Sequence, residues 1–454
     1  MRRSITILLC GALSVAAAAC VPVTKELHSR LKLPDLPYAG ELQAALELAL
    51  QEAHGNYDLG ISAAAVVPGY KPWSGVTGNS RPGIPLTADM LFNVGSVAKT
   101  FEAALALKLA EQGLLDLDAP LSTWLPAHPL IDGRITVRQL LNHTSGVFNV
   151  FEHPDFPWVG PEVDYARRWR LEEVLARFAG EPYGPPGYAQ HYSSTNYLLL
   201  TAILERAAGA SVPRQVSELF LEPLELRNSF MSMGMLPPKE FAVAHPWADV
   251  DRDGQLDDLN GVPQTWIATL THPVLYTTPS DMVRWMQALL EEQIVLSRGS
   301  LKEMLTIPEY ALPDPQGGSY GLGIVDFSEL LGVQAIGHGG STLGYSAAAV
   351  YLPDHGVALA WAINTGESPR TLADGLMRST WSRLWQTLFE HLPLEPQGTP
   401  QSGEAQTRPS PQLTLRRFSP WTPSLVAPGN ATRSFLGLVV DYPERKAETR
   451  KELR

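Results

Sequence analysis

The chain has 454 residues, of which 44% are hydrophobic and 18% charged, and its formal net charge is −12 at pH 7. This length and apolar content predict a large buried core and exclude a fibrous or wholly disordered protein. The acidic balance argues against nucleic acid as a partner, because phosphate binding needs a clustered excess of lysine and arginine. The composition leaves the oligomeric state open.

The first twenty residues have the pattern of an export signal. Two arginines follow Met1, and the apolar run that comes next, residues 5–19, is too short to span a bilayer. Residues 17–20, Ala-Ala-Ala-Cys, resemble the bacterial lipoprotein signal, although that signal prefers leucine at position 17. We therefore expect a signal peptide over residues 1–19 and a lipid on Cys20, which would anchor the protein to the cell envelope in the periplasm. The alternative is an ordinary signal peptide cleaved near Ala19.

Residues 20–38 contain three prolines and predict a tether between the lipid and the folded domain. Of the two cysteines, Cys10 lies in the segment that is removed. Only Cys20 would remain, so an internal disulfide is excluded even in an oxidising compartment, and stability must come from packing.

The folded domain, residues 39–391, is expected to open with a helix and a β-hairpin. Apolar residues from Leu42 to Ala53 recur at helical spacing, and Gly55 ends the pattern. The apolar run over residues 59–67 predicts a buried strand, which pairs through Pro68-Gly69 with a second strand near residues 73–76.

A buried helix is predicted over residues 97–112, which are almost continuously apolar, and Ser96 stands at its N-terminus. From about residue 115 to residue 270 the pattern changes to helical segments and proline-rich loops. Helices are predicted there over residues 137–141, 171–178 and 197–207, with no series of strands.

Strand patterns return after residue 319. They cover residues 320–325, 333–336, 345–352 and 357–363, and a last amphipathic helix follows from Leu372 to Phe389. We therefore predict an α/β (α+β) fold: an antiparallel sheet built from both ends of the domain, flanked by N- and C-terminal helices, with an inserted all-helical lobe. The natural place for a site is a cleft between the lobe and the sheet.

Residues 392–454 have a different character. They carry nine prolines, and residues 401–454 hold nine lysines and arginines against five acidic residues. We expect a mostly disordered, solvated tail whose end, residues 443–454, forms a short charged helix. A basic tail of this kind offers contact with anionic envelope material as the alternative.

The first candidate for chemistry is the motif Ser96-x-x-Lys99. On a helix these two residues lie one turn apart on one face, so the lysine nitrogen reaches the hydroxyl. Ser29-x-x-Lys32 matches the motif too, but it lies in the tether with no buried helix after it. A lysine in an apolar helix indicates a functional role, because burying its charge is destabilising unless the lysine is paired or neutral. A serine at this position is otherwise a simple N-cap.

Further segments point to a known family. They are residues 92–99, Phe-Asn-Val-Gly-Ser-Val-Ala-Lys; residues 135–146, which end in His-Thr-Ser-Gly; Tyr192-Ser193-Ser194; and Gly337-His338-Gly339-Gly340. Together, and in this order, they resemble the family of class C β-lactamases, D-alanyl-D-alanine carboxypeptidases, D-aminopeptidases and related esterases. The resemblance runs from about residue 40 to residue 391 and implies a β-lactamase/transpeptidase-like, two-lobed fold.

The resemblance implies roles for individual residues. Ser96 matches the nucleophile, Lys99 its activating partner and Tyr192 the tyrosine that carries the proton, and whether lysine or phenolate takes the proton stays open. The backbone N–H groups of Ser96 and Ser341 match the oxyanion hole, and His338 and Gly340 belong to the strand edge that binds substrate. His143-Thr144-Ser145-Gly146 is interpreted as structural, a helix end and turn.

Two departures from the family pattern bear on the substrate. Ser194 stands where the tyrosine motif usually ends in asparagine, and His338 stands where β-lactamases have lysine. A serine is shorter than asparagine and lacks the paired donor and acceptor groups of an amide. With histidine in place of lysine at position 338 as well, we expect the substrate to be an ester or a D-peptide rather than a β-lactam. The alternatives are a β-lactamase, or a non-catalytic module that binds penicillin or peptidoglycan.

An acidic loop resembles a calcium-binding EF-hand loop through Asp249, Asp251, Asp253 and Asp257. Position twelve is Asn260 rather than glutamate, and prolines disrupt both flanks. We therefore favour a solvated acidic loop over a calcium site, and we expect the enzyme to need no metal or other cofactor.

Overall fold

The computed structural model describes residues 39–391, except residues 56–58, 157–166, 168, 250–254, 260–271, 310–318 and 367–371. The predicted signal peptide, Cys20, the tether and the tail all lie outside the described residues. Among the helices of the described part, none is long and apolar enough to cross a membrane.

An eight-stranded sheet forms the centre of the fold, in the order β3-β2-β1-β13-β12-β11-β10-β9. Its strands are β1 (Gly60–Val66), β2 (Trp73–Arg81), β3 (Ile84–Pro85), β9 (Ser319–Tyr320), β10 (Val325–Asp326), β11 (Ile336–Thr342), β12 (Tyr345–Leu352) and β13 (Val357–Ile363). Every neighbouring pair is antiparallel, and Ile61 at the start of β1 faces Ile363 at the end of β13. The two ends of the domain therefore share one sheet, as predicted.

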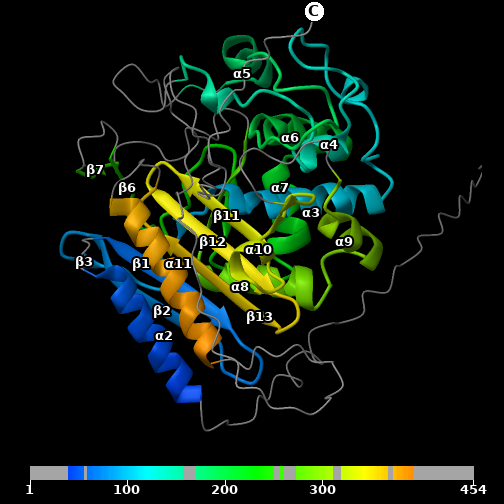
Figure 1. Cartoon of the computed structure of the whole chain (residues 1–454). Helices are drawn as coiled ribbons and strands as arrows, with labels where there is room; N and C mark the ends of the chain where they lie inside the picture. Colours follow the sequence, from blue (N-terminus) through cyan, green and yellow to red (C-terminus); the bar gives the residue numbers. More distant parts are fainter. Residues whose placement is uncertain are drawn as a thin grey trace, which may run out of the picture.

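Two terminal helices cover one face of this sheet (Figure 1). They are α2 (Ala39–His54) and α11 (Leu372–His391), which lie against each other. Their apolar stripes are buried: Leu46 and Leu50 on α2, Leu384 and Leu388 on α11. An exposed ion pair between Arg383 and Glu52 joins the helices at 2.6 Å. The helical periodicity of both segments thus predicted the packed face correctly.

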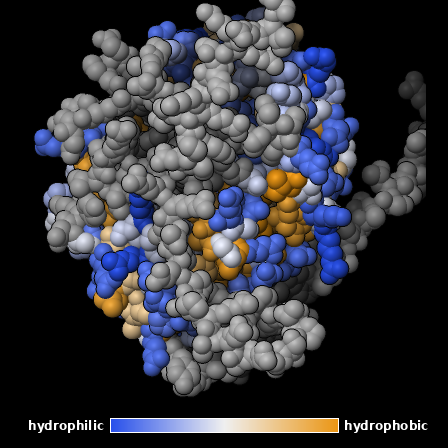
Figure 2. Space-filling view, in the orientation of Figure 1, coloured by the Kyte–Doolittle hydropathy of each residue, from blue (hydrophilic) through white to orange (hydrophobic). Residues whose placement is uncertain are grey.

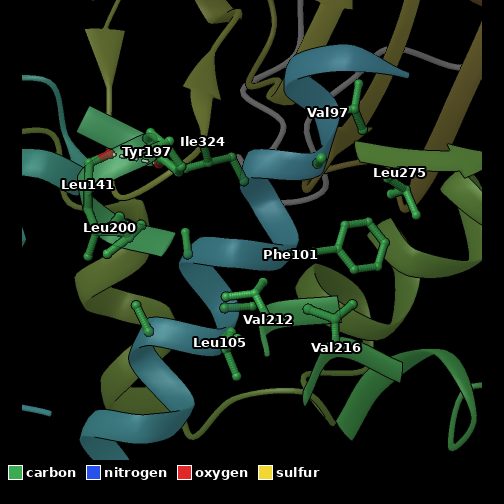
Figure 3. Close-up of a cluster of buried hydrophobic side chains, with 14 of the residues drawn as sticks. Val97, Phe101, Leu105, Leu141, Tyr197, Leu200, Val212, Val216, Leu275 and Ile324 are labelled. Atoms are coloured by element: carbon green, nitrogen blue, oxygen red, sulfur yellow. Dashed lines mark hydrogen bonds between the residues drawn. The ribbon is translucent and has the colours of Figure 1, made fainter. Parts of the chain in front are cut away.

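The other face of the sheet carries the inserted lobe. Its helices are α3 (Ala98–Glu111), α4 (Val137–Leu141), α5 (Leu171–Phe178), α6 (Thr195–Ala208), α7 (Val212–Val216), α8 (Pro279–Met286) and α9 (Arg298–Leu305). The short α10 (Ser328–Leu331) belongs to the opposite face, where its Leu331 shares a buried cluster with Leu384 of α11. Helix α3 is buried almost all round, which explains its continuous apolar sequence. Figure 3 shows Phe101 and Leu105 of α3 packed among Leu200 of α6 and Val212 and Val216 of α7.

The segment from about residue 115 to residue 270, predicted to be helical throughout, also contains short strands, which corrects that part of the prediction. They are β5 (Phe230–Ser232), β6 (Trp247–Ala248) and β7 (Asp257–Asp258); β5 pairs with β8 (Val274–Thr277), which also pairs with β4 (Phe92–Asn93), and β6 pairs with β7. These strands have only two to four residues, and β4 and β8 pair across a long sequence separation, as Phe92 does with Thr277. Local patterns do not reveal such pairings, because no alternation develops over so few residues.

Two predicted strands also differ in their bounds. The run predicted as one strand over residues 320–325 is divided: Tyr320 ends β9, Val325 begins β10, and residues 321–324 form a tight turn in which Gly323 has φ +71°. The strand expected at residues 333–336 begins at Ile336 and continues through the glycines to Thr342. Glycines have a low strand propensity, so the sequence pattern did not predict the part of β11 from Gly337 to Thr342. Each residue of β11 nevertheless has a pairing partner in β12. Among the described residues on the side of the molecule seen in Figure 2, apolar and polar side chains alternate in patches.

Candidate active site

Ser96 stands where the short strand β4 turns into the long buried helix α3. Gly95, with φ +52°, makes the turn, and its N–H donates to Asn93 Oδ1 at 3.1 Å. Ser96 lies in the 3₁₀ turn η1 (Gly95–Val97) and is partly exposed, whereas Val97 and the residues after it are buried. The hydroxyl is thus presented at the surface by a backbone that the core holds rigid.

Two further side chains meet at the Ser96 hydroxyl. Lys99 Nζ donates to Ser96 Oγ at 2.9 Å, and the Tyr192 hydroxyl donates to the same oxygen at 2.8 Å. Lys99 is only 3% exposed, and its nitrogen lies 5.3 Å from the ring centroid of Tyr192 and 5.2 Å from that of Tyr197. The structure therefore brings together Ser96 and Lys99, which were selected from one motif, and Tyr192, which was selected from another.

The backbone of β11 lies directly against η1. A Cβ added to Gly340 would stand 1.9 Å from Val94 O and 2.8 Å from Ser96 N, and one added to Gly95 would stand 2.9 Å from Ser341 N. Only glycine permits this approach. The N–H groups assigned to the oxyanion hole, those of Ser96 and Ser341, thus belong to two backbone segments in contact, and both residues are partly exposed.

A buried aromatic and histidine cluster surrounds Lys99. Its members are His143, Tyr197, Tyr320 and His338, all fully buried. The His143 ring lies 4.1 Å from that of Tyr192, and His338 Nε2 is 2.8 Å from the Tyr320 hydroxyl. His338 is therefore buried against Tyr320, and its predicted role in binding substrate at the strand edge stays a prediction.

Burial keeps this cluster uncharged. It lowers the pKa of His338 to about 3, with a further contribution from the charge of Lys99. It also lowers the pKa of His143 well below its usual value, and raises the pKa of Tyr197 and of Tyr320 well above theirs. Neutral rings of this kind give the Ser96 partners a low-dielectric setting, in which charges interact more strongly than in water.

Comparison with known protein families identifies the family of this chain. The family model described as Beta-lactamase matches residues 49–380, which include every strand of the central sheet and all of the residues just described. The chain belongs to the Beta-lactamase family.

Characterised proteins of similar sequence or structure include an esterase, a carboxypeptidase and an amidohydrolase. Esterase EstB of Burkholderia gladioli is 32% identical over 219 residues, which are 46% of this chain and 54% of that protein, so the match spans little more than half of EstB. D-alanyl-D-alanine-carboxypeptidase/endopeptidase AmpH of Escherichia coli is 25% identical over 68% of this chain and 74% of AmpH. A solved D-stereospecific amidohydrolase from Streptomyces sp. aligns with a TM-score of 0.63 and 29% identity, covering 75% of this chain and 98% of that one.

Ser194, the departure from the family's tyrosine motif, lies two residues after Tyr192 at the N-cap of α6. It is partly exposed, and its side chain makes no capping hydrogen bond. Its position beside Tyr192 is compatible with the predicted contact to substrate, and the shorter side chain leaves more open space there than asparagine would.

Asn196 is a site-supporting residue that the sequence reasoning missed. It is fully buried; its Oδ1 accepts from Ser145 Oγ at 2.6 Å, and its Nδ2 lies 3.0 Å from His143 Nδ1. It thereby ties the His-Thr-Ser-Gly turn, in which His143 has φ +59°, to the segment that carries Tyr192. An amide in the apolar start of α6 was the available signal, because a buried amide needs partners.

The acidic loop is only partly described. Asp249 is buried and Asp257 is exposed on β7, while Asp251 and Asp253 lie outside the described residues. Within the described part, no group of three or more histidine, cysteine or acidic side chains is arranged to hold a metal ion. The preference for a solvated acidic loop over a calcium site stays a prediction.

Proposed function

We propose that this protein is a serine hydrolase that cleaves an ester or amide bond through an acyl-enzyme on Ser96. The observation that carries the proposal is the pair of hydrogen bonds, from Lys99 and Tyr192, on one partly exposed serine oxygen. A nucleophile in contact with two groups that exchange protons is the arrangement that activates serine in covalent catalysis.

The acylation step follows from these contacts. When Tyr192 is ionised, the 2.8 Å contact reverses direction and the Ser96 hydroxyl gives its proton to the phenolate oxygen. Ser96 Oγ then bonds to the substrate carbonyl carbon, and the negative charge on the carbonyl oxygen is stabilised by the N–H groups of Ser96 and Ser341. The alcohol or amine leaves with the proton held by Tyr192, and water releases the acyl group by the reverse sequence.

We infer that the substrates are short esters, D-amino acid amides or D-peptides, of the kind handled by class C-related enzymes. In support, the relatives' names include an esterase, a D-alanyl-D-alanine carboxypeptidase and a D-stereospecific amidohydrolase. Ser194 in place of asparagine, and a buried His338 in place of lysine, support these substrates over β-lactams.

A labelling experiment tests the proposal. The wild-type protein should hydrolyse a chromogenic short-chain ester or a D-Ala-D-Ala peptide, and a fluorophosphonate probe should add one adduct to its intact mass. Ser96→Ala should abolish both signals, whereas Ser29→Ala, in the second Ser-x-x-Lys sequence, should keep both. Turnover that survives in Ser96→Ala would contradict the proposal.

We also propose that the protein is exported and held in the periplasm by a lipid on Cys20. The support is the sequence of residues 1–20 alone. Metabolic labelling with a palmitate analogue should mark the wild-type protein and disappear in Cys20→Ala. Label that persists in this variant would exclude the anchor.

A further inference from the structure

Strand β4 carries a buried asparagine directly before the turn that presents Ser96. Asn93 is 2% exposed and stands between Phe92 and Val94, which are both fully buried. Asparagine is a poor strand former, and an amide in an apolar interior is destabilising unless it is hydrogen-bonded. An apolar side chain would fill this position without that penalty. The amide therefore indicates a role other than packing.

The Asn93 side chain holds the next turn of the chain. Its Oδ1 accepts a hydrogen bond from the Gly95 N–H at 3.1 Å, which is the local turn that asparagine forms with the backbone two residues further on. The small sheet fixes the acceptor: Asn93 pairs with Tyr276 of β8, and the N–H of the next residue donates to Leu275 O at 3.1 Å. The acceptor thus belongs to a paired strand, and the donor belongs to the turn that carries the nucleophile.

Gly95 does not hold this turn by itself. A Cβ at position 95 would lie 2.8 Å from Ser341 O and 2.9 Å from Ser341 N, so the approach of β11 requires glycine here. Glycine, however, adopts positive and negative φ about equally well, so it does not select the observed φ of +52°. A hydrogen bond to its N–H restricts that choice, and the side chain of Asn93 accepts one.

We propose that Asn93 is a positioning residue that fixes the left-handed conformation of Gly95 and thereby the relative positions of the two oxyanion-hole N–H groups. The inference rests on the proposed hydrolase function, in which the N–H groups of Ser96 and Ser341 stabilise the oxyanion. Gly95 is bonded to Ser96 and lies against Ser341, so a rotation about its φ and ψ moves one donor relative to the other. Donors of this kind stabilise a transition state only while their geometry is fixed.

Loss of the hydrogen bond should lower kcat with little effect on KM. Donors aimed at the oxyanion act in the transition state, whereas binding of the substrate in its ground state depends on the rest of the cleft. A misplacement of about 1 Å lowers the rate by up to about 10²-fold. We therefore expect kcat to fall by about 10- to 100-fold while KM stays within about threefold of wild type. A side chain that only filled space would lower Tm without separating kcat from KM.

The experiment is steady-state hydrolysis of a chromogenic ester by full-length Asn93→Thr and Asn93→Val, with thermal unfolding of the same samples. The two new side chains have the same shape, and only threonine carries an oxygen that can accept from the N–H two residues further on. Asn93→Val should show the full decrease in kcat, and Asn93→Thr should have a kcat at least about fivefold higher at the same KM. Their Tm values should lie within about 3 °C of each other, because both shorten the side chain equally.

Gln215→Met is the matched control. Gln215 lies on α7, is 5% exposed, and donates from its amide to Ala210 O at 2.7 Å. Methionine keeps the volume and removes this hydrogen bond, so Tm should fall about as far as in Asn93→Val while kcat stays within about twofold of wild type. An equal loss of kcat in both variants would overturn the inference, since it would assign the effect to lowered stability.

The threonine and valine variants decide the rest. Equal kcat values in folded Asn93→Thr and Asn93→Val would overturn the inference, whether both match wild type or both fall. So would loss of the folded state in both, because the asparagine would then serve the fold and not the site. Wild-type turnover that persists in Ser96→Ala would instead refute the proposed function, so the two failures are distinguishable.

Discussion

The contact between Gly340 and η1 allows a sharp test of the oxyanion hole. In Gly340→Ala, the new methyl group would stand 1.9 Å from Val94 O and 2.8 Å from Ser96 N. Ordinary contacts of a Cβ begin near 3.4 Å. Both obstacles are backbone atoms, which have no alternative rotamer, so β11 must move away from η1 by about 1.5 Å or more.

That movement should affect catalysis more than folding. It carries the Ser341 N–H away from the oxyanion, and loss of one such donor lowers kcat by about 10²- to 10³-fold, or about 3–4 kcal/mol of transition-state stabilisation. Strand β11 keeps its pairing with β12, so we expect overpacking to lower the free energy of unfolding by about 1–3 kcal/mol. The Lys99 and Tyr192 contacts to Ser96 lie outside the moving strand.

The assay is steady-state hydrolysis of a chromogenic ester, with thermal unfolding measured on the same samples. Gly184→Ala is the matched control, because a Cβ there meets nothing within 4 Å, and it should keep kcat and Tm near the wild-type values. If Gly340→Ala retains kcat within about threefold of wild type, the two N–H groups do not form the oxyanion hole as argued.

Three other predictions follow from the same contacts. Tyr192→Phe should lower kcat by about 10²- to 10⁴-fold with little change in Tm, since the ring keeps its contact with His143 and only the proton carrier is lost. Asn196→Ala should lower the free energy of unfolding by about 2–3 kcal/mol, because it removes buried hydrogen bonds to Ser145 and His143. The pKa of His338 is lowered to about 3 in the folded state, so the unfolded chain binds more protons below about pH 6.5. Stability should be complete above that pH and fall as the pH drops toward 3, by about 2 kcal/mol at pH 5 from this residue alone.

Each of these has a control. Tyr188→Phe changes an exposed tyrosine and should leave kcat unchanged; an equal loss in both variants would argue against a proton-carrying role for Tyr192. Arg383→Ala breaks only the exposed pair with Glu52 and should change stability by less than about 1 kcal/mol, well below Asn196→Ala. Urea unfolding of His338→Gln should show a smaller loss between pH 7 and pH 5 than wild type, and an identical loss would contradict the assignment.

Much of the fold was readable in the sequence because the long elements carry strong periodicity. Helices α2 and α11 were visible in their apolar stripes, and β12 and β13 were predicted with the bounds that they have. The short strands β4, β5 and β8 and the glycine-rich part of β11 were missed. The pairing of β4 and β5 with β8 joins segments far apart in sequence, and the glycines of β11 have a low strand propensity, so neither shows in the local composition.

The sequence by itself determined the nucleophile and its lysine partner. Ser96 and Lys99 are one helical turn apart, so local geometry alone brings their side chains together. Everything else in the site was decided by the tertiary structure. Tyr192 reaches Ser96 across 96 positions, and β11 reaches η1 only because both ends of the domain close one sheet. Burial, which sets the charge of His338, is a property of the packed chain that no local pattern contains.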